Sequence, residues 1–223
     1  MKKSALAQTT TNLVVTAAEK LFSERGFAAV SMREIAREAG VVVSSVIYHY
    51  PDKIALLAAI YDRHTRPINA RRRELLGEAR RIPAREDRLR AELRAYLLPA
   101  FSSSEDATSG GASFTRLRAI LSAEGDPQVR EVIAGAFDET TREFIAAFAE
   151  CLPGASQEDI VWRAHFLLGS LYYTLINPDR IDRLSDGRAS GRDHETAIRM
   201  IVETAHAGLM ALSPTRERPE KVT

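Results

Sequence analysis

The sequence contains a single cysteine, Cys151, among 223 residues. One thiol cannot form an internal disulfide, so the fold does not depend on the cross-links of small secreted proteins. An isolated cysteine more often fills a small apolar space in a core than it performs chemistry. We therefore expect Cys151 to be buried and the protein to reside in a reducing compartment.

The sequence also lacks a long apolar run. No stretch approaches the ~20 apolar residues that a membrane-spanning helix requires. Lys2 and Lys3 lie near the N-terminus, but no apolar segment follows them, so the pattern is not that of a signal peptide. These absences lead us to expect a cytoplasmic protein without a membrane partner.

Recognisable catalytic and ligand motifs are missing as well. The five histidines share no spacing typical of a metal site. The sequence has no glycine-rich phosphate loop, no G-x-S-x-G motif and no histidine beside Cys151. We therefore expect no catalytic residue, no metal and no cofactor, and the sequence gives no support to an enzyme.

What the sequence does contain is an uneven distribution of charge. The formal net charge is +1, yet residues 1–90 carry seventeen basic and ten acidic side chains, whereas residues 91–223 carry fourteen and twenty. A basic N-terminal part suits contact with nucleic acid. Residues 1–53 have a net charge of only +2, however. Most of the excess lies in residues 54–90, where a solvated helix face explains it about as well as DNA does.

Apolar residues recur with the period of a helix along nearly the whole chain, and no segment alternates as a strand does. The pattern predicts an all-α protein of roughly nine helices, in which Pro67 kinks or restarts a helix. We expect an N-terminal domain at residues 8–68, a C-terminal domain at 69–213 and a flexible tail at 214–223. The longer helices and the loops are predicted as follows: helices at 10–25, 84–101, 113–123, 127–151, 156–176 and 194–212, and loops at 102–112 and 178–192.

The most informative segment is residues 31–50. Ser31 and Glu34 have the spacing of a capping box, in which each side chain accepts a hydrogen bond from the other residue's amide. Gly40 ends the short helix that follows, and Val46 and Tyr50 lie four apart on the inner face of a second one. Two short helices joined at a glycine form a helix-turn-helix, which lays its second helix in the DNA major groove.

These residues resemble the DNA-binding domain of the TetR/AcrR family of transcriptional regulators. The resemblance extends over residues 10–60, about a quarter of the chain, and three runs carry it in order. They are Ala-Ala-Glu-Lys-Leu-Phe-Ser-Glu-Arg-Gly-Phe at 17–27, Ser-Met-Arg-Glu-Ile-Ala-Arg-Glu-Ala-Gly-Val at 31–41 and Tyr-His-Tyr-Pro-Asp-Lys-Ile-Ala-Leu-Leu at 48–57. Residues 162–175 are more weakly similar to the penultimate helix of one branch of the family.

The resemblance implies that residues 8–68 form the DNA-binding domain and residues 69–213 a C-terminal effector-binding and dimerisation domain. It also implies which residues contact DNA. It assigns four residues to the groove face of the recognition helix: Val43, Ser44, Ser45 and Ile47. It assigns further residues to the phosphates, partly through the favourable partial charge at helix N-termini. These are Tyr48, His49 and Lys53, together with the Ser31 amide and the Arg33 side chain.

The base-reading face itself is apolar and weakly specifying. The recognition helix has no Arg, Asn or Gln, so it cannot read guanine or adenine by a bidentate contact. Val42 stands where the family usually has a small polar cap, and Ile47 where an aromatic or polar residue is usual. We expect the helix to start later, with Ser44 or Ser45 satisfying an amide. Phosphate contacts and DNA shape are then expected to carry much of the selectivity.

The resemblance also implies a homodimer that binds a palindromic operator. The last two long helices of each subunit, at residues 156–176 and 194–212, would form the interface. Their apolar residues also suit the core of one subunit, and we expect them to serve both purposes. These residues include Leu168, Leu171, Leu175, Ile198, Ile201 and Leu209.

Regulators of this family usually bind a small molecule in the C-terminal domain, which shifts the separation of the two recognition helices. An apolar pocket with a few polar groups suits an apolar or aromatic effector. The alternative is that these aromatic side chains simply fill a core, with His165 as a core histidine. Nine residues are candidates: Phe101, Phe114, Phe137, Phe144, Trp162, His165, Phe166, Tyr172 and Tyr173.

The sequence therefore predicts a homodimeric repressor that a small-molecule effector releases from its operator. One alternative is a DNA-binding regulator that has no ligand or acts as an activator. An alternative of a different class is an all-helical small-molecule-binding or catalytic protein in which the N-terminal motif is incidental.

Overall fold

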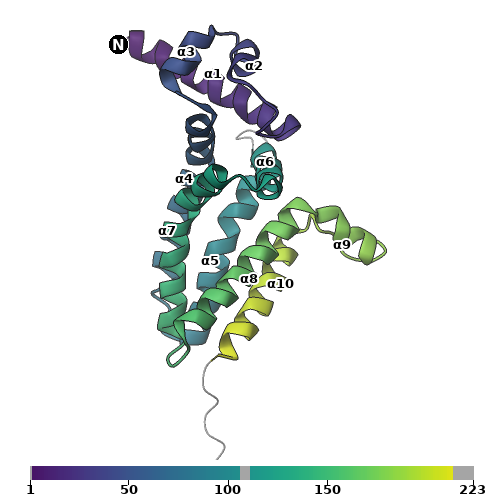
Figure 1. Ribbon diagram of the computed structural model, residues 1–223. Helices are drawn as coiled ribbons and strands as arrows, with labels where there is room; N and C mark the ends of the chain where they lie inside the picture. The colour runs from purple at the N-terminus through teal and green to yellow at the C-terminus, as the bar shows by residue number, and fades with distance from the viewer. Residues whose placement is uncertain (1, 106–110, 213–223) are drawn as a thin grey trace, which may run out of the picture. The chain divides into compact units, whose positions relative to one another are not determined.

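Helices form every regular element in the part of the chain that the structure describes. The computed structural model describes residues 2–105 and 111–212, and Figure 1 shows its helices in order. These ranges contain ten helices and no strand, so the all-α prediction is confirmed with one helix more than expected. Within the same ranges, no helix combines the length and the hydropathy that crossing a membrane requires. The predicted tail lies outside the described residues.

The first of two compact units comprises residues 1–68 and 103–138. Within it, α1 packs against α2, α3 and α6. Phe22, Val46 and Leu57 lie in its apolar core. Its helices are α1 (Lys2–Arg25), α2 (Met32–Glu38), α3 (Val43–His49), α6 (Gly111–Glu124) and the first parts of α4 (Lys53–Ala79) and α7 (Pro127–Cys151).

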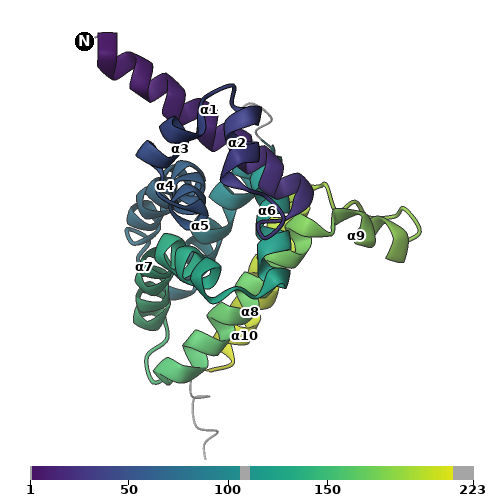
Figure 2. The same cartoon turned by 45° about the horizontal axis from the view of Figure 1, so that its top comes forward.

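The second unit comprises residues 69–102 and 139–223. Leu93, Phe144 and Leu171 lie in its core. The helices α8 and α10 lie side by side in both views (Figures 1 and 2). Besides the remaining parts of α4 and α7, this unit contains α5 (Arg85–Glu105) as far as Ser102, α8 (Gln157–Ile176), α9 (Pro178–Leu184) and α10 (His194–Met210).

The division between the units falls inside α4, α5 and α7 and not in a linker. Residues 103–138, which the sequence places in the 69–213 domain, group with the first unit. Helical periodicity carries no signal for such a division, because the same helix continues through it.

Two predicted loops are partly helical. The helix α5 runs to Glu105 and α6 begins at Gly111, both inside the predicted loop at 102–112. The helix α9 lies inside the predicted loop at 178–192, where Pro178 at its start has a backbone angle already suited to a helix.

Pro67 does not divide a helix either, since α4 continues through it. Pro67 is exposed, so the carbonyl that it leaves without an amide partner can reach water.

Candidate nucleic-acid interface

The start of α2 is fixed by the predicted capping box. The Ser31 hydroxyl accepts a hydrogen bond from the Glu34 amide at 3.3 Å, and the Ser31 amide donates to Glu34 Oε2 at 2.9 Å. The hydrogen bonds from Ser31, helped by one from Arg25, lower the pKa of Glu34 to about 2. The capping box therefore contains an ionised carboxylate at any physiological pH.

Basic residues of α1 pair with the acidic residues of α2. Lys20 Nζ lies 2.6 Å from Glu38 Oε1, and Arg25 Nη1 lies 2.8 Å from Glu34 Oε1. Both acidic side chains of α2 are thus neutralised within the unit. This reduces the repulsion that a DNA phosphate would meet beside α2.

The turn between α2 and α3 depends on Gly40. Its φ is +67°, a left-handed conformation that costs glycine little, and no atom would obstruct a Cβ there. The helix α3 begins directly at Val43, and the Ser45 amide donates to the Val42 carbonyl at 3.0 Å. The expected later start is therefore wrong, because backbone bonds begin the helix although Val42 provides no side-chain cap.

The two faces of α3 differ as the sequence predicts. Val46 is fully buried, and Tyr50 packs half-buried against the core of the first unit. On the other face, Ile47 is 51% exposed and Tyr48 is 84% exposed. Ser44 is also exposed, whereas Val43, Ser45 and His49 are partly covered. The outward face of α3 is thus a mostly uncharged surface, as expected for the predicted groove face.

Two arginines of α2 point to solvent without a partner. The Arg33 and Arg37 side chains are exposed, and neither forms a hydrogen bond or ion pair with any described residue. They contrast with Arg25, which is bound to Glu34. A guanidinium that is not already paired is available to a phosphate, which supports the assignment of Arg33 and adds Arg37 to the candidates.

Lys53, a predicted phosphate contact, is held by the backbone. Its ammonium donates to the carbonyls of Phe27 and Ala28 at 2.8 and 3.3 Å and lies 4.6 Å from the centre of the Phe27 ring. An ammonium has three N–H donors, so one remains for an anion. Lys53 therefore ties the start of α4 to the turn after α1 and keeps a free donor.

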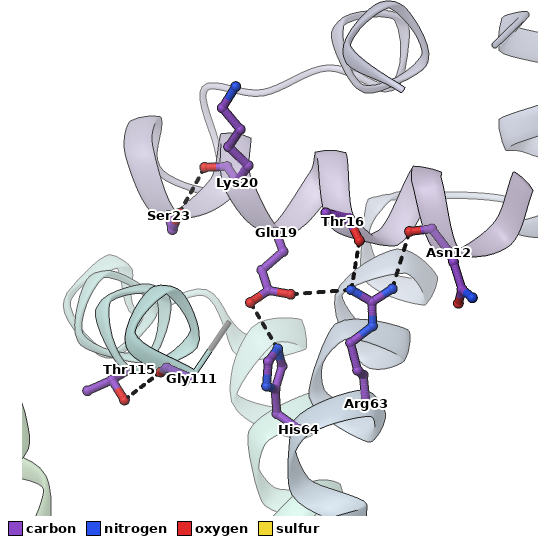
Figure 3. A network of polar contacts seen from close by, with 9 residues as sticks. All are labelled: Asn12, Thr16, Glu19, Lys20, Ser23, Arg63, His64, Gly111 and Thr115. Atoms are coloured by element: carbon purple, nitrogen blue, oxygen red, sulfur yellow. Dashed lines mark hydrogen bonds and ion pairs between the residues drawn. The ribbon is translucent and has the colours of Figure 1, made fainter. Parts of the chain in front are cut away.

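A buried polar pair joins α1 to α4. Glu19 Oε1 and His64 Nε2 lie 2.9 Å apart, and both side chains are almost fully buried (Figure 3). Arg63 Nη1 lies 3.6 Å from the other Glu19 oxygen and donates to the Thr16 hydroxyl at 3.0 Å. The His64 ring also stacks on Phe114 of α6, with 4.4 Å between the ring centres. One imidazole thus fixes three helices of the first unit.

The structure does not bring the nine candidate effector residues together. Phe114 and Phe137 lie in the core of the first unit. Phe101 and Phe144 lie in the core of the second, with Tyr172 packed against it. Core packing, the alternative considered for these side chains, accounts for these five.

The other four candidates lie on the exposed face of α8. Trp162 is 60% exposed, and Phe166 and Tyr173 are also more than half exposed. His165 lies on the same face. Helical phase explains the difference, because Ile160, Ala164, Leu167 and Leu171 occupy the buried face of α8.

The apolar residues predicted for the dimer interface lie mainly inside the second unit. Four of them, Leu171, Ile198, Ile201 and Leu209, are buried, and Leu168 and Leu175 are partly buried against the same core. They serve the subunit core. The exposed apolar side chains of α8 and α10 are a different set, namely Val161, Trp162, Phe166, Tyr173, Ile176 and Met200.

Sequence reasoning missed two charged clusters in the second unit. Arg72 is 1% exposed and lies against Tyr96, whose hydroxyl meets the Thr141 hydroxyl at 2.9 Å. Glu92 is fully buried, with one oxygen 3.7 Å from the Cys151 sulfur. Cys151 itself is buried as predicted, and burial raises the pKa of its thiol.

A signal for the buried basic residues of α4 was present in the sequence. The buried stripe of this helix includes Tyr61, Ile68 and Leu76, and His64 and Arg72 fall on it at helical spacing. A titratable residue on an apolar stripe must find a partner in the interior.

Two hollows lie within the second unit. A cavity of about 10 Å³, enough for roughly one water molecule, is lined by Tyr96, Thr141 and Phe144, with apolar side chains of α7 and α8 completing it. A wider surface hollow of about 230 Å³ lies between α4 and α5 and includes Leu75, Glu78 and Arg94. Of the nine candidate effector residues, only Phe144 lines either hollow.

Two family models match the sequence. Residues 14–60 match a model described as bacterial regulatory proteins of the tetR family. Residues 94–208 match one described as a tetracyclin repressor-like C-terminal domain, and this match alone spans more than half of the chain. A search of the curated proteins finds no significant match.

Solved structures of regulators share the fold. A TetR-family transcriptional regulator from Mesorhizobium loti is 20% identical, with a TM-score of 0.56 over 90% of this chain and 96% of the other. The fatty acid degradation regulator FadR from Bacillus halodurans is 15% identical, with a TM-score of 0.60 over 94% and 97%. SmeT, solved in complex with triclosan, is 19% identical, with a TM-score of 0.60 over 87% and 90%. At these identities the likeness shows the fold alone.

Proposed function

The chain belongs to the TetR family of bacterial regulatory proteins, and from this premise we propose that it is a homodimeric repressor released from its operator by a small-molecule effector. It is a DNA-binding transcriptional regulator, and regulators of this family are generally not enzymes. We place it in the cytoplasm, where the bacterial chromosome lies.

The observation that carries the DNA-binding role is the surface around α3. Its outward residues are uncharged, the acidic residues of α2 are neutralised by α1, and Arg33 and Arg37 stay unpaired among the described residues. Phosphates that approach α2 would therefore meet carboxylates that are already paired with cations. Ser44, Ile47 and Tyr48 are the side chains best exposed to a groove. Few of these groups read bases strongly, so DNA shape is expected to contribute to selectivity.

The proposed dimer uses the exposed apolar face of α8 and α10. Trp162, Phe166 and Tyr173 of α8, with Met200 of α10, are large apolar side chains at least half exposed in the single chain. Contiguous exposed apolar residues commonly mark a protein interface. A second copy that covers them with the same face would form a twofold dimer, and such a dimer would favour a palindromic operator.

The proposed release by an effector rests on the second unit and on two similar proteins. SmeT was solved with triclosan, and FadR is described as a regulator of fatty acid degradation. The present chain contains a small cavity lined mainly by aromatic and aliphatic residues in the unit that includes α8 and α10. A ligand that prefers one conformation of this unit would shift the population of the DNA-binding form.

Fluorescence anisotropy with DNA from directly upstream of the gene tests the regulator. We expect tight binding that weakens steeply with salt, and much weaker binding to a random duplex of equal length. Arg33→Ala should weaken binding to both duplexes, whereas the control Arg81→Ala, an exposed residue of the second unit, should not. Equal affinity for the two duplexes would contradict an autoregulatory operator.

Sedimentation of the purified chain tests the dimer. We expect the wild type to sediment as a dimer and Trp162→Glu as a monomer, because a charge in an apolar interface must be desolvated. The control Leu13→Glu changes an exposed leucine of α1 and should leave the dimer intact. A wild-type monomer, or a dimer that Trp162→Glu does not weaken, would contradict the proposed interface.

A further inference from the structure

Arg72 in the second unit is a buried cation without a counter-ion. Its side chain is 1% exposed, and within the described ranges no carboxylate oxygen lies within ion-pair distance of its guanidinium. Burial of an unpaired charge is costly, and proteins normally avoid it unless the charge has a task. Arg72 thus differs from Arg73, the next residue, which is exposed and bound to Glu143 at 2.8 Å.

The Arg72 guanidinium is held in a fixed orientation, but only some of its N–H groups donate hydrogen bonds. Nε donates to the Tyr96 carbonyl at 2.8 Å, and Nη1 donates to Asn69 Oδ1 at 3.4 Å. The guanidinium carbon lies 3.9 Å from the centre of the Tyr96 ring, which fixes its plane. Arginine has five N–H donors, and the other three donate to no group among the described residues. A fixed planar cation with free donors matches the geometry of a carboxylate.

Tyr96 connects this cation to an apolar cavity. Tyr96 and Thr141 both border the cavity of about 10 Å³, and their hydroxyls lie 2.9 Å apart. Phe144, Phe148 and Leu167 line the remainder. Tyr96 therefore contacts the Arg72 guanidinium through its ring and also borders a cavity with aromatic and aliphatic walls.

We propose that Arg72 is the anion-binding group of the effector site, and that the effector is a small carboxylate with an apolar body. The carboxylate would bind the free N–H groups of Arg72 beside the Tyr96 ring, and the apolar body would extend into the cavity that Tyr96 and Phe144 border. This inference rests on the proposed function, whose effector class it specifies. The cavity holds roughly one water molecule, so a larger body must displace the side chains of α7 and α8 that line it. Binding is then coupled to a change of conformation.

The test uses acetate, because it is the smallest carboxylate with an apolar group and so has to displace the least protein. Melting temperatures of the full chain are measured with increasing sodium acetate at constant ionic strength, for the wild type, Arg72→Met and the control Arg73→Met. At about 200 mM acetate we expect the wild type and Arg73→Met to gain about 2–4 °C more than Arg72→Met. Arg72→Met itself should melt no lower than the wild type without acetate, because it removes an unpaired buried charge.

Equal acetate shifts in the three proteins would overturn the proposal. Should Arg72→Met fail to fold, nuclear Overhauser effects from the acetate methyl group to the Tyr96 ring of the wild type decide the question. Their absence would overturn the proposal as well. Neither measurement involves DNA. Failure of the proposed carboxylate site can therefore be distinguished from failure of the proposed DNA-binding function, which the experiment with upstream DNA tests.

Discussion

The two units of this protein bury charge in opposite ways. In the first unit, Glu19 and His64 are both buried and face each other at 2.9 Å, with Arg63 beside the second carboxylate oxygen. In the second unit, Arg72 has no carboxylate near it, and the buried Oε1 of Glu92 accepts no hydrogen bond from any described residue.

The difference indicates what each unit is built to do. A buried pair with complementary partners stabilises one arrangement of its helices, which suits a unit that must present α3 in a fixed orientation. Buried groups that lack partners raise the free energy of the unligated conformation. A ligand or a proton that supplies the missing partner then changes the conformational balance.

Removing one member of the pair should have the largest effect. Glu19→Ala leaves His64 buried without its carboxylate and frees Arg63, so we expect the first unit to lose about 3 kcal/mol of stability. Urea denaturation measures the loss, and DNA affinity should fall with it. The control Glu24→Ala removes an exposed glutamate of the same helix and should cost less than about 0.5 kcal/mol. Similar losses in the two variants would show that the buried pair does not hold α1 on α4.

Removal of a buried charge should raise the stability of the second unit, whereas it lowers the stability of the first. Burial raises the pKa of Glu92 to about 7. In the unfolded chain this carboxyl ionises near its ordinary pKa, so its contribution to stability falls as pH rises from about 4.5 to 7 and is constant above that. Glu92→Gln removes this loss, so we expect a gain of about 1–2 kcal/mol at pH 8 and little change at pH 4.5.

Thermal unfolding at the two pH values checks this expectation. The control Glu78→Gln neutralises an exposed glutamate and should show no such pH dependence. A gain for Glu92→Gln that is equal at pH 4.5 and pH 8 would mean that ionisation of Glu92 does not destabilise the unit.

The same contrast explains how much could be predicted from the sequence. The capping box of Ser31 and Glu34, the turn at Gly40 and the inward Val46 are local features. Each depends on residues within a few positions, and all were confirmed. The region around α3 could be predicted because short-range hydrogen bonds and helical period determine its geometry.

The features of the second unit were harder to predict from the sequence because they join distant parts of the chain. Arg72 meets Tyr96, and Cys151 meets Glu92, at separations of 24 and 59 residues. The aromatic residues of α8 illustrate the same limit. Helical period indicates that Trp162 and Leu167 lie on different faces, but composition alone does not tell which face is buried.

A smaller effect is expected where the first unit is stabilised by local contacts only. Ser31→Ala removes the hydroxyl that accepts from the Glu34 amide, so we expect a loss of about 1 kcal/mol, measured by urea denaturation. The control Ser44→Ala changes an exposed serine of α3 whose hydroxyl forms no hydrogen bond with any described residue. It should leave stability unchanged. A loss in Ser44→Ala equal to that in Ser31→Ala would mean that the capping box adds nothing to α2.

The smallest change in stability concerns Lys53, which resembles Arg72 in the other unit. Each cation lies on an aromatic ring and donates to a backbone carbonyl, and neither pairs with a carboxylate in the described ranges. Lys53 differs in that water still reaches it, so its unpaired charge costs little. Lys53→Met should therefore lower stability by only about 0.5 kcal/mol.

If the free donor of Lys53 binds a phosphate as Arg72 is proposed to bind a carboxylate, Lys53→Met should also reduce the salt dependence of DNA binding. The slope of log affinity against log salt should fall by about 0.9 per subunit, with a similar loss of affinity for every sequence. Arg81→Met, in the second unit, provides the control and should leave the slope unchanged. An unaltered slope in Lys53→Met would mean that Lys53 only holds α4 against the turn at Phe27 and does not bind a phosphate. Lys53 and Arg72 would then share their packing but not the ability to bind an anion.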